Sequence, residues 1–293
     1  MSISINKVVD FPNEEIKNKN QIFPQMPESE NLIPLPFIAC FIGASGAGKT
    51  TSCINLVKRY VENNAFDKMV LFSPTGVPDE RTGLTADDRY LKLPFTELYS
   101  EYSDDLLEDF MERQKDDIKE FKDFLKDKKN WEKYMNDPSN PELEEKAFEI
   151  YERRGVVPPE SEMKRYPSAL IILDDLGDDP SIKKTGKSKL NNFVSRIRHA
   201  LCSFITNYQS LYMCPPTIRK QINTWIIYKS QDEKYLKSIY QECCSGDMRF
   251  DTFKKIFDLF ENRHDFLLIN MKSKDRSKKY RINFNKFLDI KDL

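Results

Sequence analysis

The sequence predicts an α/β fold with a mainly parallel central sheet, and two features carry that prediction. Short apolar runs without helical spacing recur along the chain, and amphipathic helical patterns lie between them, notably over 50–63 and 190–199. Strands that alternate with helices in this way form parallel sheets that helices cover on both faces. The strands are expected, in order, at 35–42, 68–72, 169–173, 201–206, 224–228, 266–270 and 280–284.

Each expected strand rests on its own pattern. The first, LPFIACFI, lies between Pro36 and Gly43, and the second, KMVLF, ends at Ser73 and a proline. The third, ALIIL, is followed by two aspartates, and LCSFIT and TWIIY are the fourth and fifth. The last two, FLLIN and YRINF, are joined by a lysine-rich loop, which predicts a C-terminal β-hairpin.

Composition limits the class of protein. The 293 residues are 39% hydrophobic and 32% charged, which is typical of a globular chain with much solvated surface. Lys and Arg number 46 against 47 Asp and Glu, so a globally basic coat for nucleic acid is excluded. No apolar stretch approaches the roughly 18 residues of a spanning helix, and the first residues lack a secretory apolar region. We therefore expect a soluble intracellular protein without membrane contact.

Cysteine and histidine usage argues against a zinc site. The six cysteines, Cys40, Cys53, Cys202, Cys214, Cys243 and Cys244, are scattered without a CxxC pair, and only two histidines are present. A zinc site would be short of ligands. Reduced, buried thiols are expected instead.

The chain divides into four segments by pattern and charge. Residues 1–32 predict an N-terminal arm, 33–96 the first part of the sheet domain, and 166–293 its second part with the hairpin. Residues 97–165 hold 21 acidic against 13 basic side chains and show helical spacing, broken at 137–141. We interpret them as an acidic helical insertion. One interpretation is a partner-binding or regulatory module. The other is a solvated addition to the fold, and we favour it because runs of charged residues usually mark exposed faces.

The strongest motif follows the first expected strand. The segment GASGAGKT matches GxxxxGK[ST] in full, between a buried strand and a helical pattern, as a phosphate-binding loop requires. Glycines let backbone N–H groups turn toward phosphate oxygens at the positive end of the helix. Lys49 would neutralise the β and γ phosphates, and the Thr50 hydroxyl would bind Mg²⁺. The expected nucleotide-binding residues are Gly43, Ala44, Ser45, Gly46, Ala47, Gly48, Lys49, Thr50 and Thr51.

Two carboxylates follow the third expected strand, in LIILDD. Asp174 would complete the Mg²⁺ site with Thr50, and Asp175 could act as general base toward the attacking water. The alternative is that Asp175 caps the next helix. No NKxD segment for guanine selection is present, which favours ATP.

The fourth expected strand leads to a second group of candidates. It ends in TNYQ, and a polar side chain at the tip of a strand beside the phosphate loop can sense the γ-phosphate. Gln209 is the first candidate and Asn207 the second; the alternative is an ordinary loop amide. Arg196 and Arg198 precede this strand, where an arginine can reach a phosphate bound to a neighbouring subunit. Either could instead be a surface or DNA-facing arginine.

These segments in this order resemble the FtsK/HerA superfamily of additional-strand P-loop ATPases. Within it, GASGAGKT, LIILDDL and RHALCSFITNYQ resemble the genome-packaging ATPases of large eukaryotic DNA viruses and virophages, the poxvirus-type packaging ATPase. The resemblance implies catalytic roles for Lys49, Asp175, Gln209 and Arg198, the last acting in trans. It also implies ATP with Mg²⁺, a homo-oligomeric ring, double-stranded DNA as partner, and a place in the virion or viral factory of the host cytoplasm. A capsid or portal protein is a further expected partner.

Two basic clusters are candidate DNA contacts. The stretch from Lys183 to Arg198 contains Lys183, Lys184, Lys187, Lys189, Arg196 and Arg198 without an acid. The second contains Lys272, Lys274, Arg276, Lys278, Lys279 and Arg281 with one acid, Asp275. Clustered lysines without interleaved aromatics suit duplex backbone contacts. Solvated loops are the alternative for both.

The sequence therefore favours an ATP-hydrolysing motor that translocates double-stranded DNA and packages a viral genome. A helicase loader or transposition helper ATPase is one alternative, but it needs a C-terminal helical lid, and 230–293 contains expected strands. The other alternative is a nucleotide-gated structural adaptor whose acidic insertion binds a capsid or portal protein.

Overall fold

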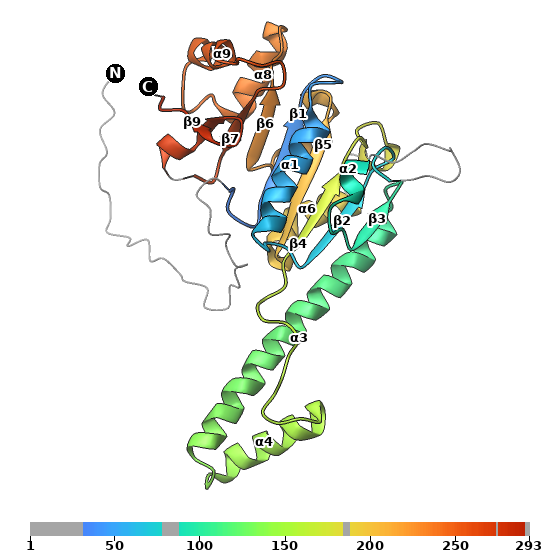
Figure 1. Ribbon diagram of the computed structural model, residues 1–293, viewed down its shortest axis with the longest axis vertical. Helices are drawn as coiled ribbons and strands as arrows, with labels where there is room; N and C mark the ends of the chain where they lie inside the picture. Colours follow the sequence, from blue (N-terminus) through green and yellow to red (C-terminus); the bar gives the residue numbers. More distant parts are fainter. Residues whose placement is uncertain (1–31, 78–87, 184–187, 274, 291–293) are drawn as a thin grey trace, which may run out of the picture.

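One mixed sheet forms the centre of the molecule (Figure 1). The computed structural model describes residues 32–77, 88–183, 188–273 and 275–290. Within them, nine strands pair in the order β3-β2-β4-β5-β1-β6-β7-β8-β9. Their bounds are β1 Ile38–Ile42, β2 Lys68–Phe72, β3 Glu97–Tyr99, β4 Ala169–Leu173, β5 Cys202–Tyr208, β6 Thr224–Tyr228, β7 Phe266–Asn270, β8 Tyr280–Ile282 and β9 Lys286–Phe287. β1 to β6 pair in parallel, and β7 to β9 pair antiparallel. The predicted α/β fold with a C-terminal hairpin is confirmed.

Helices cover both faces of this sheet. The longer ones are α1 Lys49–Glu62, α3 Asp104–Asn136, α4 Pro141–Arg154, α6 Lys189–Arg196, α8 Glu233–Cys243 and α9 Phe250–Asp258. Alternate residues of β4 enter separate hydrophobic clusters: Leu170 and Ile172 pack on the α1 side, and Ile171 packs on the side of α3, α6, α8 and α9. Because both faces are buried, the strands are continuously apolar, and this made them recognisable in the sequence.

The order of the strands determines where the site lies. β5 pairs with β1 on one side and with β4 on the other, so one additional strand separates the strand before the phosphate loop from the strand before the two aspartates. All three run in the same direction, and their carboxyl ends therefore meet at one edge of the sheet. The residues that follow β1, β4 and β5 are brought together there.

Three local features differ from the sequence-based expectation. Residues 97–99, expected within the insertion, form β3 at the edge of the sheet; three half-buried residues are too short a run to predict a strand. The segment between β6 and β7, to which the sequence analysis assigned no particular helix, contains α8 and α9. The strand expected at 280–284 ends at Ile282, because Asn283 adopts a left-handed backbone conformation with φ 57°.

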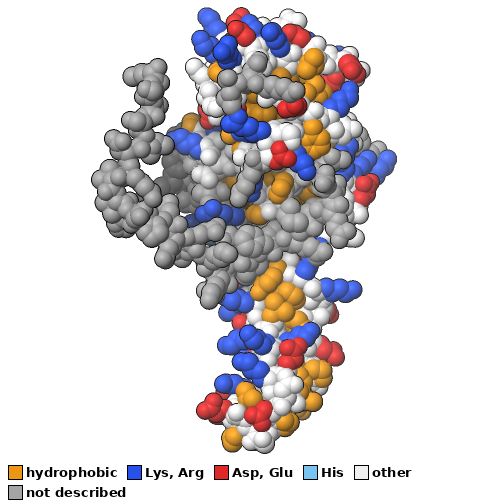
Figure 2. Space-filling model, turned by 90° about the vertical axis from the view of Figure 1, so that its left-hand side faces the viewer, with side chains coloured by type: hydrophobic (Ala, Val, Ile, Leu, Met, Phe, Trp, Pro, Cys, Tyr) orange, Lys and Arg blue, Asp and Glu red, His pale blue; other side chains and the backbone are white. Residues whose placement is uncertain are grey.

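The insertion forms a projecting helical hairpin (Figure 1). The Ser103 hydroxyl caps α3 by accepting from the N–H of Asp105 at 3.2 Å, and α4 ends at Gly155 with φ 72°. α4 packs back on α3, where the buried carboxylate of Asp127 accepts from Arg153 and from Arg154, at 2.5 and 2.6 Å. The visible face of the projection mixes acidic, basic and hydrophobic side chains (Figure 2). The insertion is therefore mixed on this face, although its net charge is negative.

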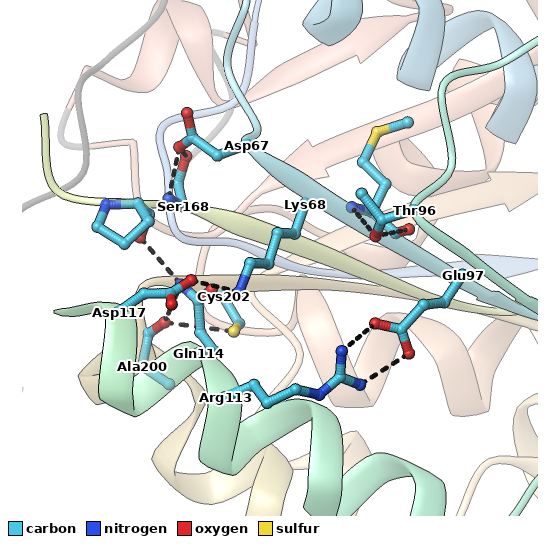
Figure 3. Close-up of polar contacts among 12 residues, drawn as sticks. Asp67, Lys68, Thr96, Glu97, Arg113, Gln114, Asp117, Ser168, Ala200 and Cys202 are labelled. Atoms are coloured by element: carbon cyan, nitrogen blue, oxygen red, sulfur yellow. Dashed lines mark hydrogen bonds and ion pairs between the residues drawn. The ribbon is translucent and has the colours of Figure 1, made fainter. Parts of the chain in front are cut away.

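The first turns of α3 are attached to the sheet by polar contacts (Figure 3). The buried amide of Gln114 donates to the carbonyl oxygens of Pro167 at 2.9 Å and Ala200 at 3.2 Å. Arg113 forms a bidentate ion pair with Glu97 of β3 at 2.8 and 3.0 Å. These contacts hold the base of the projection against the start of β4 and the turn before β5.

All six cysteines are buried and unpaired, as expected for reduced thiols. Over the described ranges, none of the helices combines the length and the apolar character that crossing a bilayer requires. Of the expected N-terminal arm at 1–32, all but Leu32 lies outside the described residues.

Candidate nucleotide site

The phosphate loop lies between β1 and α1, at the carboxyl edge of the sheet. The Lys49 ammonium donates to the carbonyl oxygens of Gly43 at 2.8 Å and Ala44 at 3.0 Å. Gly46 and Gly48 have φ of 73° and 103°, in the left-handed region that glycine adopts without strain. Burial lowers the pKa of Lys49, and the charges of two nearby carboxylates oppose that effect. The loop thus holds its cation at the cavity that it lines.

Asp174 directly follows β4, and its buried carboxylate has three side-chain donors. Thr50 Oγ1 lies 3.1 Å from Oδ2, Tyr90 Oη donates to the same oxygen at 2.7 Å, and Asn207 Nδ2 contacts Oδ1. Burial raises the pKa of Asp174, while the hydrogen bonds from Tyr90, Asn207 and Thr50 lower it, and the net shift is upward. A cation placed between Thr50 and Asp174 would favour the ionised carboxylate.

Asp175 differs from its neighbour in both backbone and exposure. It has φ 57°, a left-handed conformation that is uncommon outside glycine, and its side chain is exposed. It lines the same cavity as Lys49 and Thr50. One aspartate is therefore buried and hydrogen-bonded, and the next is open to solvent within the site.

The two polar candidates at the end of β5 take different places. Asn207 is buried and contacts Asp174 through Nδ2, while its Oδ1 forms no hydrogen bond within the described residues. Gln209 is exposed and lines the cavity. Asn207 thus contacts the buried carboxylate of Asp174 directly, and Gln209 is the amide that is open to the cavity.

A cavity of about 350 Å³ joins these elements. Its lining residues are Ser45, Gly46, Gly48, Lys49, Thr50, Thr51, Asp174, Asp175, Gly177, Asp178, Asn207, Gln209, Met213 and His264. Gly43, Ala44 and Ala47 belong to the same loop. The structure therefore brings together every predicted site residue except Arg198.

The donor set fits a magnesium–nucleotide complex. Thr50 and Asp174 supply hydroxyl and carboxylate oxygens, the hard ligands that Mg²⁺ takes, and the orphaned Oδ1 of Asn207 lies beside them. Mg²⁺ and ATP, when bound, would supply a polarised γ-phosphoryl group. Lys49 and the N–H groups of the loop would bind the phosphates, and Asp175 would take a proton from the attacking water.

Arg198 lies at the opposite edge of the sheet. It belongs to a single 3₁₀ turn, Ile197–Ala200, that enters β5 from its amino end. Its charge acts on Lys272, which follows β7 at that same edge, and burial together with this charge lowers the pKa of Lys272. Arg196 lines a separate cavity between α3 and α6. Neither arginine is part of the cavity that contains Lys49.

The expected DNA contacts are partly neutralised within the chain. Lys183 pairs with Asp178 at 2.7 Å, and Lys189 pairs with Asp105 and Glu108 of α3 at 2.9 and 2.7 Å. Lys184 and Lys187 lie outside the described residues, as does Lys274. In the hairpin cluster, Arg281 is buried and Lys279 pairs with Asp247, so neither fits the expected phosphate contact. Lys272, Arg276 and Lys278 remain from that cluster as candidates.

Sequence reasoning missed two residues that form hydrogen bonds with the predicted motifs. Tyr90 donates to Asp174 across 84 residues of sequence, and His264 Nδ1 lies 2.9 Å from the carbonyl oxygen of Ala47 across 217 residues. Neither belongs to a motif. The scarcity of histidine, two in the whole chain, was the only available signal for the second.

Three features decide the class of fold: a phosphate loop after β1, a buried aspartate after β4, and an additional strand between β1 and β4. The fold is that of a P-loop NTPase. No protein-family model and no curated protein matches the chain. Among solved structures, it is similar to the genome packaging NTPase B204 of Sulfolobus turreted icosahedral virus 2 in complex with AMP. That match has a TM-score of 0.49 and 12% identity, over 85% of this chain and 96% of the other.

Two further solved structures are similar to the chain. The DNA-packaging ATPase B204 from Sulfolobus turreted icosahedral virus has a TM-score of 0.45 and 14% identity, over 85% of this chain and 97% of that one. ATPases 2 and 3 of EssC from Geobacillus thermodenitrificans have a TM-score of 0.47 and 14% identity, over 88% of this chain and 40% of that one.

Proposed function

We propose that this chain is an ATP-hydrolysing motor that translocates double-stranded DNA and packages a viral genome, acting in the virion or viral factory. The observation that carries the proposal is the division of the site between two edges of the sheet. Lys49, Asp174 and Asp175 meet in one cavity, whereas Arg198 lies at the far end of β5. Such a site contains the groups for hydrolysis but receives its arginine from another subunit.

The arrangement around the two aspartates supports hydrolysis over simple nucleotide binding. Asp174, buried under Tyr90 and Asn207, is suited to hold a metal with Thr50. Asp175, exposed at the cavity, is free to accept a proton from water. A binding protein needs the first carboxylate but has no use for the second in this position.

The position of Arg198 supports a ring of identical subunits. It is exposed, and it lies at the edge of the sheet opposite the chain's own phosphate loop. If successive subunits pack this edge against the next cavity, Arg198 would stabilise charge on the transferred phosphoryl group.

DNA contact is assigned to basic groups at both edges of the sheet. The turn between β7 and β8 carries Arg276 and Lys278 at the Arg198 edge, and both are exposed. Lys183 is exposed at the opposite edge, near the aspartates. Surface ion pairs such as Lys183 with Asp178 are worth little, so a DNA phosphate can replace the carboxylate. These groups would grip the backbone without reading bases.

The experiment is steady-state ATP hydrolysis with and without long duplex DNA, with Lys49→Ala as the inactive reference. Stimulation by DNA is expected and should fall steeply as salt rises, because phosphate contacts release counterions. Matched tests with single-stranded DNA separate this motor from a helicase loader. Turnover that is identical with and without duplex DNA would overturn the proposal.

The projecting hairpin favours a second candidate, a nucleotide-gated structural adaptor. α3 extends from the sheet domain and carries α4 at its far end, where a capsid or portal protein could bind without touching the nucleotide cavity (Figure 1). A switch requires binding rather than turnover. Full biological activity of an Asp175→Asn protein would therefore favour the adaptor, and loss of that activity would favour the motor.

A further inference from the structure

A turn from the C-terminal part of the chain lies against the phosphate loop. The turn covers residues 261–265, between α9 and β7. His264 Nδ1 is 2.9 Å from the carbonyl oxygen of Ala47, and because a carbonyl only accepts, this nitrogen donates. A Cβ atom on Gly48 would lie 3.2 Å from the same nitrogen, and one on Gly46 would lie 3.7 Å from Arg263 Nη2. Arg263 and His264 thus approach three successive residues of the loop.

The buried carboxylate of Asp265 makes this turn rigid. Its Oδ2 accepts from the backbone N–H groups of Glu261 and Asn262, both at 2.9 Å, and its Oδ1 accepts from Asn283 Nδ2 at 2.9 Å. Asn283 also accepts from the N–H of Phe266 at 3.3 Å, where β7 begins. The turn is therefore tied to two strands, and the positions of Arg263 and His264 are fixed by the sheet.

Apart from the contact of His264 with Ala47, no partner among the described residues explains the position of these two side chains. Both are exposed, and within the described residues Arg263 forms no ion pair or hydrogen bond. His264 lines the nucleotide cavity and uses one ring nitrogen on Ala47, which leaves Nε2 for a ligand. A rigid turn that holds a cation and a histidine over a phosphate loop matches the chemistry of a polyphosphate.

We propose that the Arg263–His264 turn is a second wall of the nucleotide site, which contacts bound ATP within the same subunit. Arg263 donates to the phosphates from the side opposite Lys49, and His264 fixes the loop at Ala47 and offers Nε2 to the nucleotide. The inference rests on the proposed nucleotide binding, but not on hydrolysis or DNA. This wall comes from the C-terminal strands and acts in cis, whereas Arg198 is assigned to a neighbouring site.

The test is nucleotide affinity without DNA. The dissociation constants of ADP and of the β,γ-methylene analogue of ATP are measured with Mg²⁺, by competition with a fluorescent nucleotide. Arg263→Ala is expected to weaken binding roughly tenfold to a hundredfold, the value of one hydrogen bond to a charged group. Arg249→Ala, an exposed arginine at the start of α9 that is not within 4 Å of a Cβ on Gly46, is the matched control and should stay within twofold of wild type.

The pattern of loss identifies the contact. Weaker binding of the ATP analogue alone places Arg263 at the γ-phosphate, and weaker binding of both ligands places it at the shared phosphates; either supports the inference. His264→Asn keeps a donor for Ala47 but lacks Nε2, so it should weaken binding almost as much as His264→Ala. The inference would be overturned if Arg263→Ala bound both ligands within twofold of wild type while the thermal unfolding of the nucleotide-free protein was unchanged. If the wild-type ATPase were not stimulated by DNA, the proposed motor function would fail, but this inference would not be affected.

Discussion

Arg198 and Gln209 lie at opposite ends of β5: the arginine precedes the strand and the glutamine follows it directly. The strand has seven residues, and from Cys202 to Tyr208 it spans about 20 Å at the usual rise per residue. An arginine side chain cannot cover that distance. A single subunit therefore cannot bring both residues to one phosphate, and a site that uses both must be shared between subunits.

A mixing experiment tests this shared site. Lys49→Ala subunits lack a working phosphate loop but keep Arg198, whereas Arg198→Ala subunits keep their loop. Each variant alone should lose at least about a hundredfold in ATP turnover within assembled rings, since arginine fingers are worth 10³ or more. Mixed rings should regain measurable turnover, because an Arg198→Ala site then borrows the arginine of a Lys49→Ala neighbour.

Arg196→Ala serves as the parallel variant, because Arg196 lies two residues away and lines a different cavity. It should keep turnover close to wild type. Full activity of assembled Arg198→Ala rings would contradict the assignment, and if Arg196→Ala rings were then inactive, the trans role would move to Arg196.

Tyr90 should control how tightly the site holds its metal. Tyr90→Phe removes the 2.7 Å hydrogen bond to Asp174 Oδ2 and leaves the ring in place. The lost hydrogen bond orients the Asp174 carboxylate and is worth about 1 kcal/mol of Mg²⁺-binding free energy. Its loss should raise the Mg²⁺ concentration for half-maximal turnover about fivefold. Tyr99→Phe is the control, since Tyr99 donates to Glu97 on the edge strand β3, outside the cavity. An unchanged Mg²⁺ dependence of Tyr90→Phe would contradict this role.

The sequence predicted those parts of the candidate site that consist of residues next to one another in the chain. The phosphate loop and the pair Asp174–Asp175 each follow a buried strand, so local patterns were sufficient to place them at one edge of the sheet. Tyr90 and His264 reach the same cavity from distant segments, and only the folded backbone brings them there. Such contacts leave no fixed spacing in a single sequence.

The same reasoning explains the partial success at β5. Both polar residues at its end were predicted to lie at the site, and the cavity contains both. Alternation along a strand turns Asn207 toward Asp174 in the buried layer, but Gln209 follows the strand, where alternation no longer predicts direction. The ion pairs of Lys183 and Lys189 could not be predicted from the sequence either, because their partners lie in the loop after β4 and in α3.

Gln114 should stabilise the junction between the projecting helix and the sheet. Gln114→Ala leaves the carbonyl oxygens of Pro167 and Ala200 buried without this donor, and it removes buried side-chain volume. We expect a loss of about 2–4 kcal/mol in the free energy of unfolding, measured with urea. Gln241→Ala on the exposed side of α8 should cost less than about 0.5 kcal/mol. Equal effects of the two substitutions would show that the junction contributes nothing specific.

Asp265 should make the stability of the C-terminal turn depend on acid. Burial raises its pKa, but hydrogen bonds from Asn283 and from the N–H groups of Asn262 and Glu261 outweigh it, and the net shift is downward. A lowered pKa in the folded state means that this stabilisation is complete above the ordinary value of about 4 and is lost as pH falls through the folded-state pKa. Asp265→Asn should therefore cost about 1–3 kcal/mol at pH 7 and clearly less at pH 3, which lies below the ordinary pKa, so that proton uptake by the unfolded chain has already removed part of the stabilisation. The measurement is the difference in unfolding free energy between wild type and variant at both pH values, with exposed Asp258→Asn as the control that should show no such change. If the difference in unfolding free energy between wild type and variant stayed the same at pH 7 and pH 3, the charge of Asp265 would not stabilise the turn. The effect of Asp265→Asn would then come from the shape of the side chain alone.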